Sequence, residues 1–260
     1  MSNGLDAVIL DIDLGNSALK YRLADYSGRL PHLADGAIDI DGLHRALVGS
    51  SARSATGSLQ RVRVCSVLSS DLNTEFAEQI MERWGVTAEF ARSLPAVGGV
   101  TNGYREPSSL GVDRWMVVLA AYHRCSGAAL VIDLGTAITL DYLRADGQHL
   151  GGYIVPGTHL SQRVLLTDTA SIAVSANSSA ETTELLLQPG SSTQEAVSRG
   201  ALLMVRNLIE LEAERLRASS RQSLAVLLCG GGAQEISPLL QCAHEILPDL
   251  VLEGLDQALP

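Results

Sequence analysis

The sequence predicts an α/β fold made of two similar halves. The turn Asp-Leu-Gly occurs at residues 13–15 and again at 133–135, each time directly after an apolar run that is typical of a buried strand. An alternating strand and a second turn follow each copy, and helix–strand units come after them. This repeat indicates two α/β domains with a cleft between them, where ligands usually bind. We place the boundary near residue 114, which gives halves 1–114 and 115–260.

Composition restricts the class of protein before any motif is considered. The 260 residues can bury a large core, and an apolar content of 46% is typical of a globular protein. The formal net charge of −10 argues against a nucleic-acid-binding surface, which needs clustered Lys and Arg. The four cysteines form no Cys-x-x-Cys pair, and no signal peptide or membrane span stands out. We therefore expect a soluble cytoplasmic protein with reduced thiols and with neither nucleic-acid nor membrane partners.

The first half begins with strands and continues with helices. The irregular and extended segments expected in chain order are a strand meander over 7–40, a loop over 49–57, strands over 62–67 and 88–90, and an irregular stretch over 95–111. Residues 74–84 predict an amphipathic helix, because large apolar side chains recur every four residues and Gly85 is placed to end it. A second, apolar helix begins at Asp113 and extends to residue 123.

The second half repeats this order of elements. The expected segments are a strand meander over 130–155, a long amphipathic helix over 194–218, a buried strand over 224–228 and a helix over 234–242. Three consecutive glycines, residues 230–232, separate the last strand from the last helix.

The chemistry of the repeated turn favours an anion with its cations. Gly15 and Gly135 carry no Cβ and can take φ > 0, so backbone N–H groups can approach an anion closely. Asp13 and Asp133 are hard oxygen ligands suited to a cation that accompanies phosphate. Short polar side chains follow the glycines: Asn16, Ser17 and Thr136. Two such turns would clamp a polyphosphate, although Asp-x-Gly is also a good turn without any ligand.

Two further glycine-rich segments add to this pattern. The glycines at 230–232 follow a buried strand, where backbone without side chains lets a base or a phosphate lie close; the alternative is a plain loop. Residues 151–157 are denser in Gly and Pro than a strand usually tolerates. They could form the floor of a pocket, or a strand with a bulge and a stop.

A polar loop over residues 104–114 leads into the apolar helix of the first half. Asp113 would lie at the helix N-terminus, either as an N-cap or as a carboxylate that accepts a proton from a substrate hydroxyl during phosphoryl transfer. The two roles are compatible, because a helix N-terminus helps to keep a carboxylate ionised. Arg114 could pair with an anionic substrate or with a surface acid such as Glu106. Asp11 could join a metal site or face solvent.

The remaining chemical signals are weaker. Residues 192–195 (Ser-Thr-Gln-Glu) form a capping box at the start of the long second-half helix, so Thr193 could cap that helix or offer its hydroxyl to a substrate. The six histidines show no metal-ligand spacing, and no Walker P-loop is present. Any phosphate binding would therefore use the paired turns.

Four motifs taken together resemble the type III pantothenate kinase family. They occur in the family's order and spacing at residues 13–20, 111–114, 133–137 and 151–157, and the match extends from about residue 8 to 235. The resemblance implies an actin/sugar-kinase/Hsp70-like (ribonuclease H-like) fold with a central cleft. It also implies a homodimer that phosphorylates pantothenate with ATP, Mg²⁺ and a monovalent cation (K⁺ or NH₄⁺), the first step of coenzyme A synthesis.

The resemblance also implies a role for each matching residue. ATP and its Mg²⁺ would be bound by Asp13, Gly15, Asn16, Ser17, Lys20 and Thr136, with Asp13 reaching Mg²⁺ through phosphate. The monovalent cation would be bound by Asp133. The pantothenate pocket would be lined by Tyr104, Gly111, Val112, Asp113, Arg114 and Thr193, and Asp113 would be the proton acceptor.

The chain departs from the family pattern at two places, and two other functions compete. Val112 stands where the family usually has Ala, and Ile172-Ala173 replaces the usual Leu-Pro, which affects the shape of the substrate pocket. One alternative is a kinase for another small alcohol. The other is a transcription-linked accessory protein, since some relatives carry the name Bvg accessory factor, but the acidic charge argues against direct contact with DNA.

Overall fold

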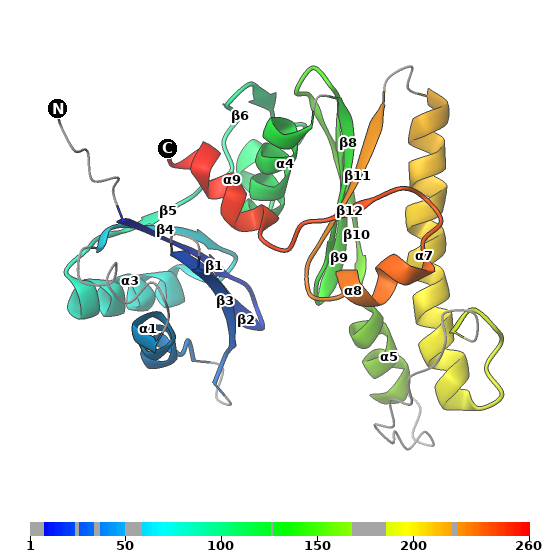
Figure 1. The fold of residues 1–260 in the computed structure, drawn as a ribbon, viewed down its shortest axis with the longest axis horizontal. Helices are drawn as coiled ribbons and strands as arrows, with labels where there is room; N and C mark the ends of the chain where they lie inside the picture. Colours follow the sequence, from blue (N-terminus) through cyan, green and yellow to red (C-terminus); the bar gives the residue numbers. More distant parts are fainter. Residues whose placement is uncertain are drawn as a thin grey trace. The chain divides into compact units, whose positions relative to one another are not determined.

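The computed structural model divides the chain into two compact units. It describes residues 8–23, 26–33, 37–49, 59–125, 127–167, 186–219 and 223–260 (Figure 1). The first unit comprises residues 1–120 together with 249–260, and the second comprises 121–248. The boundary expected near residue 114 thus lies a little further along the chain, and the C-terminal residues belong to the first unit rather than to the second half.

The first unit is built on a five-stranded mixed sheet in the order β3-β2-β1-β4-β5. Its strands are β1 (Val8–Leu14), β2 (Ala18–Leu23), β3 (Tyr26–Pro31), β4 (Leu59–Ser66) and β5 (Ala88–Phe90). The first three are antiparallel neighbours, whereas β4 and β5 run parallel to β1. The carboxyl ends of β1, β4 and β5 therefore meet at one edge of the sheet, which is where ligands bind in open α/β sheets.

The second unit repeats this topology strand by strand. Its sheet has the order β10-β9-β8-β11-β12, again with three antiparallel strands followed by two parallel ones. The strands are β8 (Ala128–Leu134), β9 (Ala137–Leu143), β10 (His149–Pro156), β11 (Leu224–Cys229) and β12 (Glu245–Ile246). The duplicated α/β architecture expected from the repeated turns is thereby confirmed.

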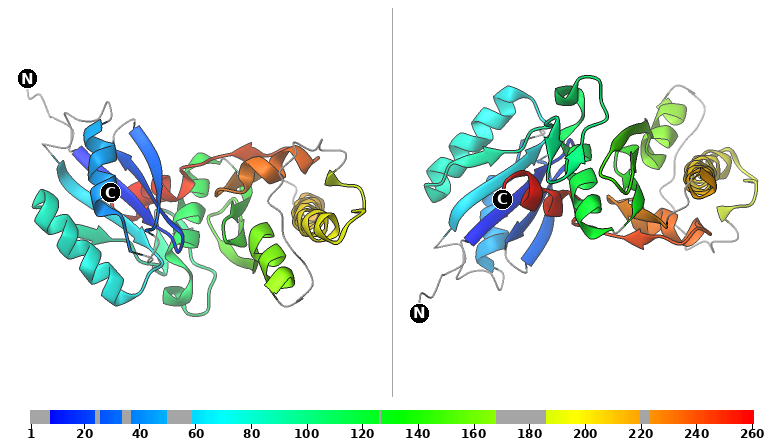
Figure 2. Two further views of the ribbon diagram at one scale, coloured as in Figure 1. Left: turned by 90° about the horizontal axis from the view of Figure 1, so that it is seen from below. Right: turned by 90° about the horizontal axis from the view of Figure 1, so that it is seen from above.

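Alternation along β1 gives the first sheet two different faces. Leu10, Ile12 and Leu14 are fully buried in a core that includes Phe76 and Ile80. Those two side chains come from α3 (Ser70–Trp84), which lies with α1 (Ile40–Gly49) on one side of the sheet (Figure 1). The carboxylates of β1 are on the opposite face, because successive side chains of a strand alternate. There α9 (Leu250–Ala258) packs against β1 and β4 (Figure 2).

The second core has the same plan. Leu130, Ile132 and Leu134 of β8 are buried against the long helix α7 (Thr193–Ser219), which contributes Leu202 and Ile209. Helix α5 (Thr158–Thr167) packs against α7. Each unit thus buries one hydrophobic face of its own sheet.

Several boundaries differ from the sequence-based expectation. Helix α1 was not predicted, although Leu43 and Leu47 are spaced for a buried helix face. Helix α3 begins earlier than expected because Ser69 caps it, and it ends as predicted at Gly85, whose φ is 68°. The irregular stretch contains a small hairpin, β6 (Ala96–Val97) with β7 (Val100–Thr101), and the 3₁₀ turn η1 (Pro107–Ser109), and it leads into α4 (Val112–Arg124).

The helix expected over residues 234–242 is shorter than predicted. It consists of α8 (Ala233–Ile236) and the 3₁₀ turn η2 (Ser237–Leu239), because Pro238 cannot donate the backbone hydrogen bond that would continue an α-helix. The loop expected over 49–57 lies outside the described residues beyond residue 49, as do Ile172 and Ala173. Among the helices that the structure describes, none has the length and apolar character needed to cross a bilayer.

Candidate functional site

The first Asp-Leu-Gly turn joins β1 to β2 at the carboxyl edge of the first sheet. The Gly15 N–H donates to the Ala18 carbonyl at 3.1 Å and closes the turn. Gly15 does not adopt a positive φ, and a Cβ there would stand 3.4 Å from that carbonyl, an ordinary contact. The turn therefore does not use the left-handed backbone that a glycine can adopt. Asn16 and Ser17 are exposed at the tip, where a ligand can reach them.

Asp13 and Lys20 face each other across β1 and β2 just below this turn. They are register partners, and Lys20 Nζ lies 3.6 Å from Asp13 Oδ2. The Asp13 side chain is 10% exposed and that of Lys20 24% exposed. The pair therefore places one carboxylate and one ammonium group beside the turn that the sequence singled out. A carboxylate is a suitable ligand for a hard cation, and an ammonium group for phosphate.

Asp11 has neither of the two roles considered for it, because it is buried in an ion-pair network. Its carboxylate accepts hydrogen bonds from Arg63 Nε at 2.7 Å and from Arg22 Nη2 at 2.6 Å. Burial alone would lower the pKa of Arg63, but the hydrogen bonds and charges of Asp11 and Asp256 outweigh it and raise that pKa. Asp11 is therefore committed to holding two arginines.

The second turn lies among the two other glycine-rich segments. The Gly157 N–H donates to the Thr136 carbonyl at 2.9 Å, and the Gly232 N–H donates to the Leu134 carbonyl at 2.8 Å. A Cβ at position 157 would stand 2.5 Å from the Gly135 carbonyl oxygen. Residues 133–137, 157 and 230–232, which the sequence suggested separately, thus meet at one place in the second unit.

Gly230 gives this place its most specific feature. Its φ is +82°, and a Cβ there would stand 2.3 Å from Asp133 Oδ1 and 2.7 Å from the Leu134 backbone. Only glycine leaves space beside the Asp133 carboxylate, which is half-buried, while Thr136 nearby in the turn is exposed. The Asp133 carboxylate thus lies directly against the Gly230 backbone, and a carboxylate is a suitable ligand for a cation. Gly135, like Gly15, does not take a positive φ.

Residues 151–157 combine the two alternatives considered for them. Gly151 has a φ of +88°, and the register between β10 and β9 shifts between His149 and Gly152, which marks a β-bulge. At the other end of the segment, Gly157 packs against the second turn. The segment is therefore a bulged strand whose last glycine belongs to the candidate site.

The polar loop before α4 is organised by a buried asparagine that sequence reasoning missed. The Asn102 side-chain amide donates to the carbonyls of Leu94 and Pro107, both at 3.3 Å, and its Oδ1 accepts from the Tyr104 N–H at 3.0 Å. Ser93 Oγ donates to the Leu110 carbonyl at 2.8 Å. Hydrogen bonds thus fix the loop at both ends. The role of Asn102 is recognised only because the structure buries this polar side chain.

Asp113 lies in the first turn of α4 but is not its N-cap. The helix begins at Val112, and the Gly111 carbonyl accepts from the Trp115 N–H at 3.0 Å, so Gly111 holds the cap position. A Cβ at Gly111 would stand 2.7 Å from Asp113 Oδ1, which itself accepts from the Arg114 N–H at 2.8 Å. Gly111 therefore leaves room for the carboxylate, and the helix N-terminus favours its charge.

Arg114 is held by Tyr104 rather than lying at the surface. The guanidinium donates from Nη1 to Tyr104 Oη at 2.5 Å, and its carbon lies 5.4 Å from the centre of the Tyr104 ring. Arg114 is only 4% exposed, while Val112 is half-buried. This contact joins two residues that the sequence had grouped in one loop.

Ser192, not Thr193, caps the long helix of the second unit. Ser192 Oγ accepts from the Glu195 N–H at 3.2 Å, and the Glu195 carboxylate reaches back to the Ser191 N–H at 2.7 Å. Thr193 is the first helical residue and is exposed. Its hydroxyl therefore does not have the capping role that the sequence favoured.

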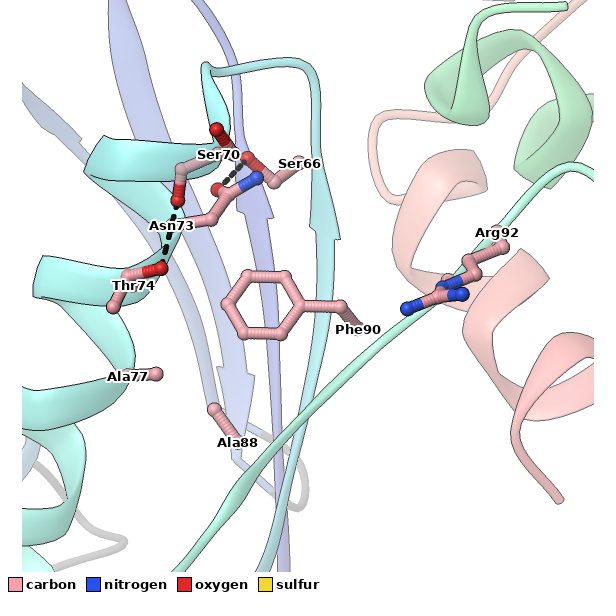
Figure 3. A pocket seen from close by; sticks show the side chains of 9 residues that line it. Ser66, Ser70, Asn73, Thr74, Ala77, Ala88, Phe90 and Arg92 are labelled. Atoms are coloured by element: carbon pink, nitrogen blue, oxygen red, sulfur yellow. Dashed lines mark hydrogen bonds between the residues drawn. The ribbon is translucent and has the colours of Figure 1, made fainter. Parts of the chain in front are cut away.

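A cavity of about 520 Å³ opens between α3 and the edge strand β5 (Figure 3). The Phe90 ring points into it, and Arg92 lies at its other side (Figure 3). Ser66, which donates to Asn73 Oδ1 at 2.5 Å, lines the end nearest the carboxyl edge of the sheet. Ser66 is also the register partner of Leu14, the last residue before the first turn. One lining residue of the cavity is thus paired with the strand that ends in that turn.

The candidate residues divide into two groups, one for each unit, by the unit to which they belong. The group of the first unit consists of Asp13, Gly15, Asn16, Ser17, Lys20, Tyr104, Gly111, Val112, Asp113 and Arg114. The group of the second unit consists of Asp133, Thr136 and Thr193 with the glycines around the second turn. Each group combines a carboxylate, hydroxyl or amide side chains and a tight backbone turn, as phosphoryl transfer requires.

Comparison of the sequence with known proteins gives one consistent family. Residues 9–215 match the family model described as type III pantothenate kinase. The chain is 39% identical over 254 residues to the type III pantothenate kinase of Ectopseudomonas mendocina, covering 97% of this chain and 99% of that protein. It is also 39% identical over 256 residues to that of Pseudomonas putida, with the same coverage.

Solved structures with a similar fold are much more distant in sequence. A Campylobacter jejuni protein assigned to the Baf family of transcriptional activators superposes with a TM-score of 0.58 at 20% identity, covering 95% of each chain. A Sinorhizobium meliloti protein assigned as a 2-dehydro-3-deoxygalactonokinase gives 0.53 at 17% identity, covering 95% of this chain and 97% of that one. With the duplicated sheets, they confirm the actin/sugar-kinase/Hsp70-like fold class.

Proposed function

The chain belongs to the type III pantothenate kinase family, which phosphorylates pantothenate in coenzyme A biosynthesis, and from this premise we propose how its own residues act. The observation that carries the proposal is the pair of Asp-Leu-Gly turns at equivalent positions of two equivalent sheets. As a kinase it uses ATP and a divalent metal. In this assignment the first unit supplies the acceptor loop and one phosphate turn, and the second unit supplies the other turn.

The first turn is the proposed site for the ATP phosphates. Asn16 and Ser17 are exposed at its tip, Gly15 brings backbone close to a ligand, and Lys20 adds positive charge beside Asp13. Mg²⁺, when bound with ATP, supplies positive charge next to the phosphate oxygens. Asp13 is the residue that would hold this ion through phosphate, and it is already kept in place by Lys20.

The second turn is the proposed site for a monovalent cation and for further contacts to ATP. Asp133 supplies a carboxylate that Gly230 leaves accessible, and Thr136 supplies an exposed hydroxyl in the same turn. K⁺ or NH₄⁺ at Asp133 would balance negative charge beside the phosphates. The absence of a side chain at Gly230 supports this assignment, since a Cβ at that position would collide with Asp133 Oδ1.

The chemical step is an in-line transfer of the γ-phosphoryl group to the primary hydroxyl of pantothenate. The hydroxyl oxygen forms a bond to the γ-phosphorus, the bond from that phosphorus to the bridging oxygen of ADP breaks, and the hydroxyl proton passes to Asp113. Because an alcohol is a weak acid, its proton leaves late, and positioning supplies most of the rate. Arg114, which donates a hydrogen bond to Tyr104, would attract the carboxylate of pantothenate.

The remaining substrate contacts and the assembly are part of the same proposal. Gly111 and Val112 would line the acceptor pocket beside Asp113, and the exposed Thr193 would contribute a hydroxyl to pantothenate. We propose a homodimer, because α7 exposes Leu203, Met204 and Leu211 along its length. We also propose that the enzyme acts in the cytoplasm. All four cysteines are described, and none forms a disulfide, in keeping with a reducing compartment.

The decisive experiment measures ADP release and 4′-phosphopantothenate formation from ATP and pantothenate, with and without K⁺. Replacing Asp113 with Asn should lower turnover about a hundredfold or more, as loss of a positioned base typically does. Asp71→Asn is the matched control, since it removes the same charge from the first turn of α3 and should leave turnover within about twofold.

Each possible outcome of this experiment has a definite meaning. Near-normal turnover in Asp113→Asn would overturn the assignment of the proton acceptor. Turnover that is faster with another alcohol than with pantothenate would identify a kinase for a different small alcohol. Tight, salt-sensitive DNA binding without any turnover would instead support an accessory role in transcription.

A further inference from the structure

The C-terminal helix α9 belongs to the first unit although the chain reaches it from the second. The chain leaves the first unit within α4, forms the whole second unit, and returns between Pro248 and Asp249. α9 then packs on β1 and β4, on the sheet face that carries Asp11 and Asp13 (Figure 2). The last twelve residues of the chain, 249–260, therefore lie on the strand that ends in the first turn.

An ion-pair network fastens α9 to this sheet face. Arg63, which is 4% exposed, donates to Asp11 Oδ1 at 2.7 Å and to Asp256 Oδ1 at 2.5 Å. Arg22 Nη2 lies 2.6 Å from Asp11 Oδ2 and 3.0 Å from Asp256 Oδ2. Both arginines thus bind Asp11 of β1 and Asp256 of α9. Asp256 supplies the second negative charge that balances the two positive charges.

The same arginines also bind backbone carbonyls of α9. Arg63 Nη1 donates to the Leu259 carbonyl at 2.9 Å, and Arg22 Nη2 donates to the Leu252 carbonyl at 3.1 Å. The Leu259 carbonyl stands at the C-cap of α9 and has no partner within the helix, so a guanidinium group is well suited to satisfy it, whereas the Leu252 carbonyl lies in the first turn of the helix. The arginines of the sheet therefore hold α9 through the Asp256 side chain and through backbone carbonyls of the helix.

On its other side α9 touches α4 backbone to backbone. A Cβ at Gly254 would stand 2.2 Å from the Met116 carbonyl oxygen and 2.6 Å from its carbonyl carbon, so only glycine permits this approach. Met116 lies one helical turn after Asp113 in α4. A shift of α9 at this contact would therefore be felt directly in the turn that carries Asp113.

We propose that α9 is a brace that sets the position of Asp113 relative to the first turn, with Asp256 and Gly254 as positioning residues. The brace connects β1, which ends at that turn, to Met116 of α4, one helical turn after Asp113. Neither Asp256 nor Gly254 touches the reacting groups; they act through Arg63, Arg22 and Met116. The inference rests on the proposed role of Asp113 as proton acceptor.

The test compares Asp256→Asn with Asp249→Asn. Asp256→Asn removes one carboxylate from the network and leaves Asp11 as the remaining charged partner of the two arginines. Asp249→Asn is the control, because Asp249 precedes the same helix and its side chain makes no capping hydrogen bond. We expect Asp256→Asn to lower kcat tenfold to about a hundredfold, since displacements of about 1 Å can have such effects. The KM for ATP should stay within about twofold, Asp256→Glu should recover most of the loss, and Asp249→Asn should behave as wild type.

A second readout does not depend on activity. Hydrogen exchange of the backbone amides of residues 115–117 in α4 should become about tenfold faster in Asp256→Asn and remain unchanged in Asp249→Asn, because local opening of α4 would be favoured. Gly254→Ala should show the same acceleration, with a larger loss of kcat.

These readouts separate the inference from a purely structural role. A lower melting temperature in Asp256→Asn with unchanged kcat and unchanged exchange in α4 would overturn the brace. If the wild-type protein failed to phosphorylate pantothenate, the proposed function would fall, while the exchange experiment would still decide whether α9 holds α4.

Discussion

Gly230 shows at the scale of one residue how a missing side chain shapes the second turn. Its backbone lies against Asp133 and Leu134 at distances that no Cβ could tolerate, and its φ of +82° disfavours any other residue. Gly231, the next residue, has nothing within 4 Å of an added Cβ. Two adjacent glycines in one loop therefore have very different constraints, which their identity alone does not reveal.

Gly230→Ala should be destabilising and should impair the cation site. We expect a loss of about 2–4 kcal/mol in the free energy of unfolding, from overpacking and from the left-handed backbone, together with loss of activation by K⁺. Gly231→Ala is the matched control and should change stability by less than about 0.5 kcal/mol. Urea unfolding and assays over a K⁺ series would measure both. Equal effects of the two substitutions would contradict this account.

At the scale of elements, the loop before α4 depends on one buried side chain. Asn102 satisfies two carbonyls and one N–H of the loop, so that Tyr104 and the start of α4 are held in a fixed arrangement. The helices and strands around it were largely predictable, because alternation and four-residue spacing are local patterns. The hairpin β6–β7 was not predicted, since two-residue strands are too short to show alternation. Helix α1 was missed although Leu43 and Leu47 are spaced for a buried face, and α8 ends early because Pro238 interrupts it.

Asn102→Ala should loosen the acceptor loop without affecting the phosphate turns. We expect the KM for pantothenate to rise about tenfold, because at least one buried carbonyl of the loop loses its hydrogen-bond partner. The KM for ATP should change less than about twofold. Asn73→Ala provides the control, because Asn73 also makes side-chain hydrogen bonds in the first unit but outside this loop. A similar rise in the pantothenate KM in both variants would indicate general destabilisation instead.

At the scale of the whole molecule, each unit has its own core, and the second unit exposes apolar side chains on α7. Leu203, Met204 and Leu211 are 40%, 50% and 61% exposed. Met204 and Leu211 are seven residues apart and thus lie on one face of the helix. An apolar stripe of this kind on an exposed helix is suited to pack against a second copy of the chain.

Met204→Glu combined with Leu211→Glu should therefore dissociate the homodimer. Introducing two charges into a desolvated contact should weaken association by about a hundredfold or more. Light scattering coupled to size-exclusion chromatography at micromolar concentration would measure the mass. Leu72→Glu with Met81→Glu, which alters two exposed apolar residues of α3, should leave the mass unchanged. A monomeric wild-type protein would exclude the proposed assembly.

The sequence by itself predicted the duplicated α/β plan and suggested the residues of the candidate site. Turns, caps and strand alternation arise from neighbours in the chain, so the two Asp-Leu-Gly turns and the Gly111–Arg114 segment can be recognised from the order of residues alone. Their chemical types are enough to indicate phosphate and a hydroxyl acceptor.

Only the tertiary structure decided how those residues are held. Arg63 joins Asp11 and Asp256, from which it is separated by 52 and 193 positions. Gly230 meets Asp133, and Gly254 meets Met116, across similarly long stretches of chain. Contacts of this kind leave no local pattern in the sequence, because they depend on how sheets and helices pack once each has formed.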